Sequence, residues 1–434
     1  MPSQSSDDSK ELQDLRQLRE ILSSYNAPLE EAVGCGCIQV LMPYLHGGMK
    51  PELTLESAWM CSNIATSTDK QTVEQLLQIT HLLLTHIESS ANEAVAEQCC
   101  ACIGNIASES EHVRATLLKQ NAMQSLYKIL LKGVNGESLA ATAAWAISNL
   151  VRGAFLEALE VLMSFPQVEE TLWKAFASAD PLLVIEVSWI LVYLSAGPSE
   201  HLARITKHNV VHLLVMKLEA ATMETTSLDS AVTLLVPLMR TLGNICSEGN
   251  DMTKLQLLQS QHTAGALKTV CACLQSPKRV LQKDAAFLLS SITGLQGPEG
   301  VHLVKDTPNL MPTLYSLASV AMFDIKKEIA YTLANICAGG GGQQGNAQEI
   351  QSAASQGSFR VFLDLIETRG DLDAVFLGLQ FFEMALRVAP QCGSLLEELN
   401  GMEIIENVQY TSQNKEISRM ASYIVDAYFG DTDM

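Results

Sequence analysis

Residues 56–65 read Glu-Ser-Ala-Trp-Met-Cys-Ser-Asn-Ile-Ala, a small, mostly apolar stretch in which Asn63 follows Trp59 by four positions. The same pairing of a large aromatic residue with an amide returns at residues 143–150. It returns again at residues 187–194, where a tyrosine replaces the amide. Weaker copies carry an amide or a serine at the corresponding place: Asn105, Asn244, Ser291 and Asn335. One short pattern therefore recurs along most of the chain.

The copies lie about 42–51 residues apart, and a helical repeat with a period in the forties is typical of armadillo and HEAT solenoids. Hydrophobic residues make up 47% of the 434 positions but aromatic residues only 6%, which favours helices packed on helices over sheets. We therefore predict an all-α fold, a right-handed superhelical solenoid of about ten armadillo repeats that ends in a capping repeat. The expected domain spans residues 10–430, between a disordered polar tail at residues 1–9 and a short tail at residues 431–434.

The net charge of −20 limits the classes of partner. So acidic a surface repels the phosphate backbone, and we do not expect direct binding of nucleic acid. It favours basic partners and speeds their approach. The sequence has no long apolar run and its first residues are polar, so we expect neither contact with a membrane nor a secretory signal.

Eleven cysteines are present, and some of them lie close together in the sequence, for example Cys35 with Cys37 and Cys271 with Cys273. Without a secretory signal the thiols are expected to be reduced, in the cytosol or the nucleus. A metal site is one interpretation, but these pairs lack the second pair or the histidines that such sites use. Burial as small residues between helices is the favoured interpretation, and no metal or other cofactor is expected.

The spacing of the aromatic and the amide explains why they belong together. Residues four apart on an α-helix differ by about 40° in azimuth and ~6 Å in rise, so their side chains share a face. Repeated in each unit, the pairs would form two parallel ladders along a concave groove. An asparagine amide matches the N–H and C=O groups of an extended peptide, and a tryptophan ring attracts Lys or Arg by roughly 0.5–2 kcal/mol. The alternative is that asparagine ends a helix and that tryptophan is ordinary core.

These residues resemble importin-α (karyopherin-α), the armadillo family that carries proteins with basic nuclear-localisation signals into the nucleus, and in particular its divergent plant-type branch. The resemblance runs from Leu12 to Phe429. Residues 56–65 match the opening of the family's major site, and residues 97–107 and 144–150 match the next two repeats. Two substitutions particular to the family also occur in order, Tyr193 in place of asparagine and Arg240 in place of tryptophan.

The resemblance implies two sites that bind a basic cargo peptide in an extended conformation. In the major site it assigns the pocket of a critical lysine to Thr72 and Glu109, and additional negative field to Glu186. The complete major site is Trp59, Asn63, Thr72, Asn105, Glu109, Trp145, Asn149, Glu186, Trp189 and Tyr193. The minor site is Arg240, Asn244, Thr253, Phe287, Glu328, Tyr331 and Asn335.

Several positions depart from the family pattern. Ala101 replaces the middle tryptophan of the major site, which removes a wall shared by two lysine slots, and Glu109 replaces an aspartate. In the minor site Phe287 and Tyr331 replace tryptophans, and Ser291 replaces an asparagine. Because phenylalanine and tyrosine attract cations less strongly than tryptophan, we expect weaker or altered binding of basic peptides at both sites.

The family also carries a basic N-terminal segment that binds importin-β and folds back onto the groove when free. Here the sequence opens with acidic residues 7–11 and enters the first repeat at once. Two explanations stay open: the sequence is cut short, or the protein is an open form that does not recruit importin-β through that segment. The resemblance further implies that residues 423–429 contact the export receptor with Ran-GTP, and that the protein occurs in both cytoplasm and nucleus.

Two functions follow from these observations. The first is a nuclear-import adaptor that binds basic localisation signals along the groove, and the alternative is an armadillo scaffold for partners outside nuclear transport. Ala101 favours the scaffold, whereas Thr72 and Glu109 favour the adaptor. An enzyme is not expected, because no histidine accompanies a recognisable nucleophile motif. The glycines at residues 339–342 lack the Gly-Lys-Ser/Thr of a phosphate loop and predict a flexible connection between helices.

Overall fold

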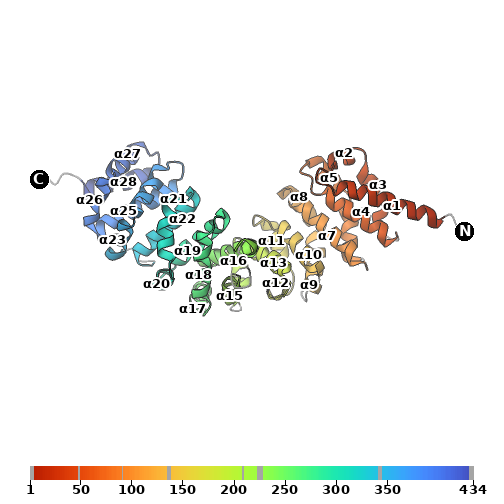
Figure 1. Cartoon of the computed structure of the whole chain (residues 1–434), viewed down its shortest axis with the longest axis horizontal. Coiled ribbons are helices and arrows are strands. Elements are labelled where there is room, and N and C mark those ends of the chain that lie inside the picture. Colours follow the sequence, from red (N-terminus) through yellow and green to blue (C-terminus); the bar gives the residue numbers. More distant parts are fainter. Residues whose placement is uncertain are drawn as a thin grey trace. The chain divides into compact units, whose positions relative to one another are not determined.

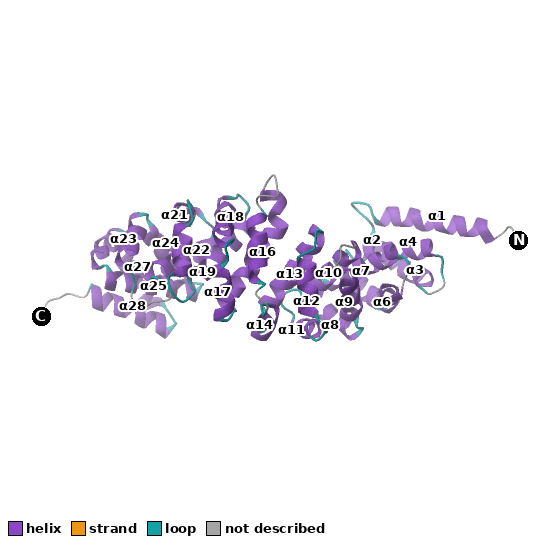
Figure 2. Ribbon diagram, turned by 90° about the horizontal axis from the view of Figure 1, so that it is seen from below, coloured by secondary structure: helices purple, strands orange, loops and turns teal. Residues whose placement is uncertain are grey.

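The chain is helical throughout the part that its computed structural model describes, which is residues 4–46, 49–89, 91–133, 138–207, 210–221, 228–340 and 345–429 (Figure 1). Within these ranges no residue lies in a β-strand (Figure 2), and no helix is both long enough and apolar enough to cross a membrane. The prediction of an all-α fold is therefore confirmed. The chain divides into two compact units, residues 1–205 and residues 206–434.

In the first unit the helices after α1 recur in threes, and the third helix of each triplet carries the aromatic–amide pattern. We call these third helices the motif helices; in this unit they are α4, α7, α10 and α13. The helices of the first unit are α1 (Gln4–Leu22), α2 (Leu29–Gly34), α3 (Cys37–Leu45), α4 (Pro51–Ile64), α5 (Lys70–Leu77), α6 (Thr80–Ser89), α7 (Glu93–Ala107), α8 (Glu111–Lys119), α9 (Ala122–Gly133), α10 (Ser138–Leu150), α11 (Leu156–Met163), α12 (Val168–Phe176), α13 (Pro181–Ser195) and α14 (Ser199–Ile205).

The second unit continues the same order, and its motif helices are α16, α19 and α22. Its helices are α15 (Val211–Ala220), α16 (Leu228–Glu248), α17 (Asp251–Gln259), α18 (Thr263–Gln275), α19 (Arg279–Thr293), α20 (Glu299–Asp306), α21 (Leu310–Val320), α22 (Phe323–Ala338), α23 (Ala347–Ser355), α24 (Ser358–Glu367), α25 (Leu372–Val388), the 3₁₀ helix η1 (Pro390–Cys392), α26 (Gly393–Glu398), α27 (Gly401–Thr411) and α28 (Lys415–Tyr428).

Consecutive motif helices pack against each other inside each unit. In the first unit α4 contacts α7, α7 contacts α10, and α10 contacts α13. In the second unit α16 contacts α19, and α19 contacts α22. The pattern residues of successive repeats are therefore brought onto neighbouring helices, as the period of the sequence predicts.

In six triplets one residue in the left-handed conformation marks the turn between the first and second helix. These residues are Gly36, Asn121, Gln167, Asn309, Gly357 and Asn400, with φ between 55° and 86°. Glycine and asparagine tolerate this region better than other residues, which explains why they punctuate the sequence at these places. Gln167 lacks that advantage.

Side-chain caps fix where several helices begin. Asn92 accepts a hydrogen bond from the backbone N–H of Ala94 at the start of α7, and Ser110 accepts one from Val113 at the start of α8. Such caps satisfy N–H groups that have no partner within the helix. Pro51 and Pro181 open the motif helices α4 and α13, a position at which proline costs no hydrogen bond.

The structure describes only part of the two expected tails and of the expected glycine-rich connection. Helix α1 begins at Gln4, so it includes residues 4–9 of the stretch expected to be a disordered tail, and that part of the prediction is wrong. Residues 1–3 and 431–434 lie outside the described residues. So do residues 222–227, and residues 341 and 342 of the glycine run at residues 339–342, which lies between α22 and α23.

The cysteines lie in the helical core, as expected. All except Cys35 are buried, and burial raises the pKa of Cys61 and of Cys246 to about 12. A thiol with so high a pKa stays protonated at neutral pH and packs as a small apolar group. Among the described residues no group of three or more potential ligands could hold a metal ion.

Candidate functional site

The predicted site residues fall into two groups, one in each unit. In the first unit the aromatic and amide positions occupy the four consecutive motif helices. We call this set the first motif face: Trp59 and Asn63 on α4, Asn105 on α7, Trp145 and Asn149 on α10, and Trp189 and Tyr193 on α13. The second motif face comprises Arg240 and Asn244 on α16, Phe287 on α19, and Tyr331 and Asn335 on α22.

A glycine of the preceding motif helix provides room for each of two aromatic rings. A Cβ atom added to Gly104 would lie 2.4 Å from Cζ3 of Trp145, so the ring packs directly on the backbone of α7. The same arrangement occurs in the second unit, where a Cβ at Gly243 would lie 2.4 Å from Cε1 of Phe287. Because a real Cβ does not approach a ring so closely, glycine is required wherever the ring keeps this position. Gly104 and Gly243 are thereby explained by contact with the next repeat.

Two asparagine amides connect a motif helix to the one before it. Asn105 donates from Nδ2 to the carbonyl oxygen of Ser62 over 3.0 Å, and Asn335 donates to the carbonyl oxygen of Ser290 over 3.2 Å. The acceptors lie in the preceding repeat, so these amides do not end their own helices. This excludes the interpretation that Asn105 and Asn335 are simple helix stops.

Two glutamates occupy equivalent positions on the two faces. Ser148 Oγ donates to Glu186 Oε2 over 3.2 Å, and Ser290 Oγ donates to Glu328 Oε2 over 2.5 Å. Both glutamates are half-buried, and among the described residues neither forms an ion pair. Burial raises the pKa of Glu186, and the hydrogen bond from Ser148 opposes that rise only in part. Each glutamate is thus a partly desolvated anion that a cation could neutralise.

The aromatic rings differ in how they are presented. The Trp59 ring is 38% exposed, whereas Trp145 and Trp189 are half-buried. Trp189 stacks on Tyr193, with ring centroids 6.2 Å apart and planes inclined by 29°. Trp189 also lies one helical turn after Glu186, so an aromatic surface and a carboxylate adjoin each other on α13.

The two predicted threonines take part in helix caps. Thr72 is buried, and its backbone N–H and its hydroxyl both donate to Asp69 Oδ2 over 2.8 Å at the start of α5. Thr253 is also buried, and it donates in the same way to Asn250 Oδ1 at the start of α17. Glu109 lies in the turn between α7 and α8 and is half-buried. A role for these residues in a lysine pocket stays a prediction.

Arg240 pairs with a carboxylate that sequence reasoning did not single out. Its Nε donates to Asp284 Oδ1 over 2.9 Å, and its Nη2 donates to Asp284 Oδ2 over 3.1 Å. The Asp284 side chain is only 4% exposed, and burial raises its pKa while the guanidinium opposes that rise. Asp284 lies three residues before Phe287 on α19, as Glu186 lies three residues before Trp189 on α13, and this shared register could have drawn attention to the carboxylate.

The first motif face also contacts residues of α1 that were not predicted. Arg19 Nε donates to Glu56 Oε2 over 2.5 Å, and the Arg19 guanidinium lies over the Trp59 ring, 4.4 Å from its centroid. Arg16 Nε donates to Glu56 Oε1 over 3.2 Å. Arg16 and Arg19 are three residues apart in a helical stretch and therefore share a face, which is the signal by which they could have been found.

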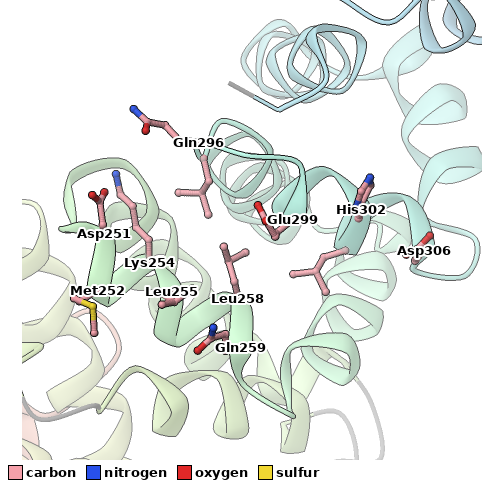
Figure 3. A pocket seen from close by; sticks show the side chains of 12 residues that line it. Asp251, Met252, Lys254, Leu255, Leu258, Gln259, Gln296, Glu299, His302 and Asp306 are labelled. Atoms are coloured by element: carbon pink, nitrogen blue, oxygen red, sulfur yellow. The ribbon is translucent and has the colours of Figure 1, made fainter. Parts of the chain in front are cut away.

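A separate hollow of about 730 Å³ lies between α17 and α20 (Figure 3). Apolar side chains such as Met252 and Leu255 line it together with charged residues that include Asp251 and Glu299 (Figure 3). None of the predicted site residues lines this hollow. It is therefore not part of either motif face.

Two plant proteins are similar in sequence to this chain over most of its length. It is 34% identical to "Importin subunit alpha-9" of Arabidopsis thaliana, in a match that covers 96% of this chain and 79% of that protein. It is 32% identical to "Importin subunit alpha-2" of Oryza sativa subsp. japonica, over 97% of this chain and 79% of that protein. Residues 392–434 match the family described as "Atypical Arm repeat", which covers α26, α27 and α28.

The fold has a solved counterpart. A crystal structure described as an engineered protein superposes with a TM-score of 0.75 and 22% sequence identity, covering 96% of this chain and 94% of that one. At this level of identity the likeness concerns the fold alone. Together with the Arm-repeat match, it confirms the prediction of an all-α armadillo solenoid.

Proposed function

Because the chain belongs to the importin-α family of nuclear-import adaptors, which are not enzymes, we propose that it binds the basic nuclear-localisation signals of cargo proteins along its first motif face. The cargo peptide lies extended across α13, α10 and α7. Lysine and arginine stems pack on the rings of Trp145 and Trp189, and their charged ends lie near Glu186 and Glu109. The second motif face, with Glu328, Tyr331 and Asn335, is the second site for such a signal.

The observation that carries this proposal is the combination of half-buried tryptophan rings with a half-buried, unneutralised carboxylate. Glu186 accepts a hydrogen bond from Ser148 and has no cationic partner within the described residues. A desolvated carboxylate favours a cation more strongly than an exposed one. The tryptophan one turn away supplies an aromatic face for the alkyl stem and charge of the same side chain.

The proposal extends to the partners and location of the protein. We infer binding to importin-β and to the export receptor with Ran-GTP, and a distribution between cytoplasm and nucleus. For the export receptor the proposed contact is α28, where the Tyr423 side chain is 53% exposed.

Fluorescence anisotropy of a labelled peptide with a short cluster of lysine and arginine tests the central proposal. The titration uses about 150 mM salt, at which unspecific attraction to the acidic surface is largely screened. We expect binding in the micromolar range or tighter, and loss of binding when one lysine of the cluster is replaced by alanine.

Two charge-matched variants assign the site. Glu186→Gln removes the half-buried carboxylate beside Trp189, and we expect it to weaken binding by about 10- to 150-fold, the range of a hydrogen bond to a charged group. Glu157→Gln removes the same charge from an exposed position on α11 and should bind like the parent. Equal affinities of the two variants would place the peptide elsewhere. A folded protein that binds no basic peptide would favour the alternative function, an armadillo scaffold outside nuclear transport.

A further inference from the structure

Helix α1 and the residue that follows it contact both members of the first aromatic–amide pair. The helix packs along α4, beside which it lies in both views (Figures 1 and 2). The guanidinium of Arg19 lies over the Trp59 ring at 4.4 Å from the centroid, and Asn63 Nδ2 donates to Ser23 Oγ over 2.8 Å. The place where a cargo cation would stack on Trp59 is thus already taken by a cation of the chain.

The neighbouring carboxylate is neutralised in the same way. Glu56 lies one turn before Trp59 on α4, as Glu186 lies one turn before Trp189 on α13. Unlike Glu186, Glu56 forms ion pairs, with Arg19 at 2.5 Å and with Arg16 at 3.2 Å. Its side chain is only 9% exposed, and that of Arg19 is 18% exposed. A pair that is withdrawn from water to this extent keeps much of its strength at physiological salt.

The other end of the first motif face is different. Among the described residues no cation stacks on the Trp145 ring, and Glu186 has no cationic partner. The face therefore contains one cation slot that is filled from within, on α4, whereas no such occupant lies on the Trp145 ring or beside Glu186 among the described residues.

We propose that Arg19 is a built-in occupant of the first cation slot and so sets the length and position of the basic cluster that the face recognises. A cargo peptide binds from α7 to α13, and it reaches Trp59 and Glu56 only by displacing Arg19. This inference rests on the proposed function of the face. It adds that Arg19 is a specificity-determining residue that lowers the affinity for long basic clusters.

The peptide length at which Arg19 matters follows from helix spacing. Packed helices lie about 8–10 Å apart and an extended chain advances about 3.3 Å per residue, so each motif helix corresponds to about three peptide residues. A basic cluster of about four residues is bound without reaching α4, whereas one of about ten residues reaches it from α13.

The test compares Arg19→Ala with Arg16→Ala, each titrated with a short and a long lysine–arginine peptide at about 150 mM salt. Both variants remove one positive charge from α1 and one partner of Glu56, but only Arg19→Ala uncovers Trp59. For the long peptide we expect Arg19→Ala to bind about 2- to 5-fold more tightly than the parent, the range of one exposed cation–π contact. Arg16→Ala should change the affinity less than Arg19→Ala, and neither variant should gain for the short peptide.

Several results would overturn the inference. If the parent binds both peptides and Arg19→Ala gains nothing with the long one, Arg19 is not a competitor, and the proposed function stands. If Arg16→Ala gains as much as Arg19→Ala, the effect is one of charge and not of the Trp59 slot. If neither peptide binds to any of the proteins, the proposed function and this inference both fail. Arg19→Gln, which keeps the stem and can still donate to Glu56, replaces Arg19→Ala if the latter is not folded by circular dichroism.

Discussion

Because Trp145 packs directly on Gly104, we predict that Gly104→Ala lowers the stability of the parent protein. The same substitution should raise the stability of a protein in which Trp145 is replaced by alanine. In Gly104→Ala the new Cβ would lie 2.4 Å from Cζ3 and 2.6 Å from Cε3 of the Trp145 ring. The contact is with a rigid ring on the adjacent helix, so either the ring or the helix must move. Gly104 is buried in the interior of α7, where the methyl group cannot turn to solvent.

Two opposing effects set the magnitude. Alanine is favoured over glycine in a helix interior by about 0.5–1 kcal/mol. Forcing an additional group into a packed contact costs about 1–3 kcal/mol. The larger effect is the clash, and we expect a net loss of stability of about 1 kcal/mol, or about 2–4 °C in melting temperature for a unit of this size.

The assay is a thermal melt followed by far-UV circular dichroism, in four proteins that form a double-mutant cycle. In a Trp145→Ala background the clash is absent, and Gly104→Ala should then raise the melting temperature relative to Trp145→Ala alone. Gly34→Ala is the matched control, because no atom lies within 4 Å of the position of its Cβ. A Gly104→Ala protein as stable as the parent, with unchanged tryptophan emission, would refute the packing argument.

Three further predictions concern charge and thiol chemistry. Burial raises the pKa of Glu186, so the Glu186 carboxyl group binds a proton more tightly in the folded protein than in the unfolded chain. The contribution of Glu186 to stability therefore increases as pH falls. Glu186→Gln should therefore melt no lower than the parent at pH 7, and a clear loss of stability would contradict this. Arg240→Ala leaves the buried Asp284 carboxylate without its bidentate partner and should cost about 1–3 kcal/mol at pH 7, less than a fully buried pair because Arg240 is 35% exposed. The stability lost in Arg240→Ala should become smaller as pH falls toward 5, because the raised pKa of Asp284 lets the carboxylate be neutralised by a proton. A loss that does not change with pH in urea titrations would contradict this prediction. Finally, Cys35 is the one exposed thiol, so iodoacetamide should modify one cysteine rapidly in the native protein, and Cys35→Ser should abolish that reaction.

The repeat architecture could be predicted because its signals are local. The residues of the pattern recur at one register of one helix in each unit, and that register repeats the same intrahelical geometry each time. The turns also follow from single residues, as at Gly36 and Asn121, where a positive φ is required. The aromatic and amide positions named from the family resemblance all lie on motif helices.

Side-chain pairing between repeats could not be predicted in the same way. Arg19 reaches Glu56 across 37 positions, and Arg240 reaches Asp284 across 44. Whether such residues meet depends on the angle and spacing at which two helices pack, which no local pattern encodes. The same holds for Thr72, which the resemblance assigned to a lysine pocket and whose hydroxyl donates to Asp69 in a helix cap.

The amino-acid sequence by itself determined which helices form, their order in threes, and which helix of each triplet carries the tryptophans and asparagines. Tertiary structure alone decided which of these residues stay available to a partner. At α4, Arg19 lies on Trp59 and neutralises Glu56, whereas Glu186 on α13 has no cation beside it among the described residues. The reason is physical: availability depends on contacts between neighbouring helices, and those contacts exist only after the repeats have stacked.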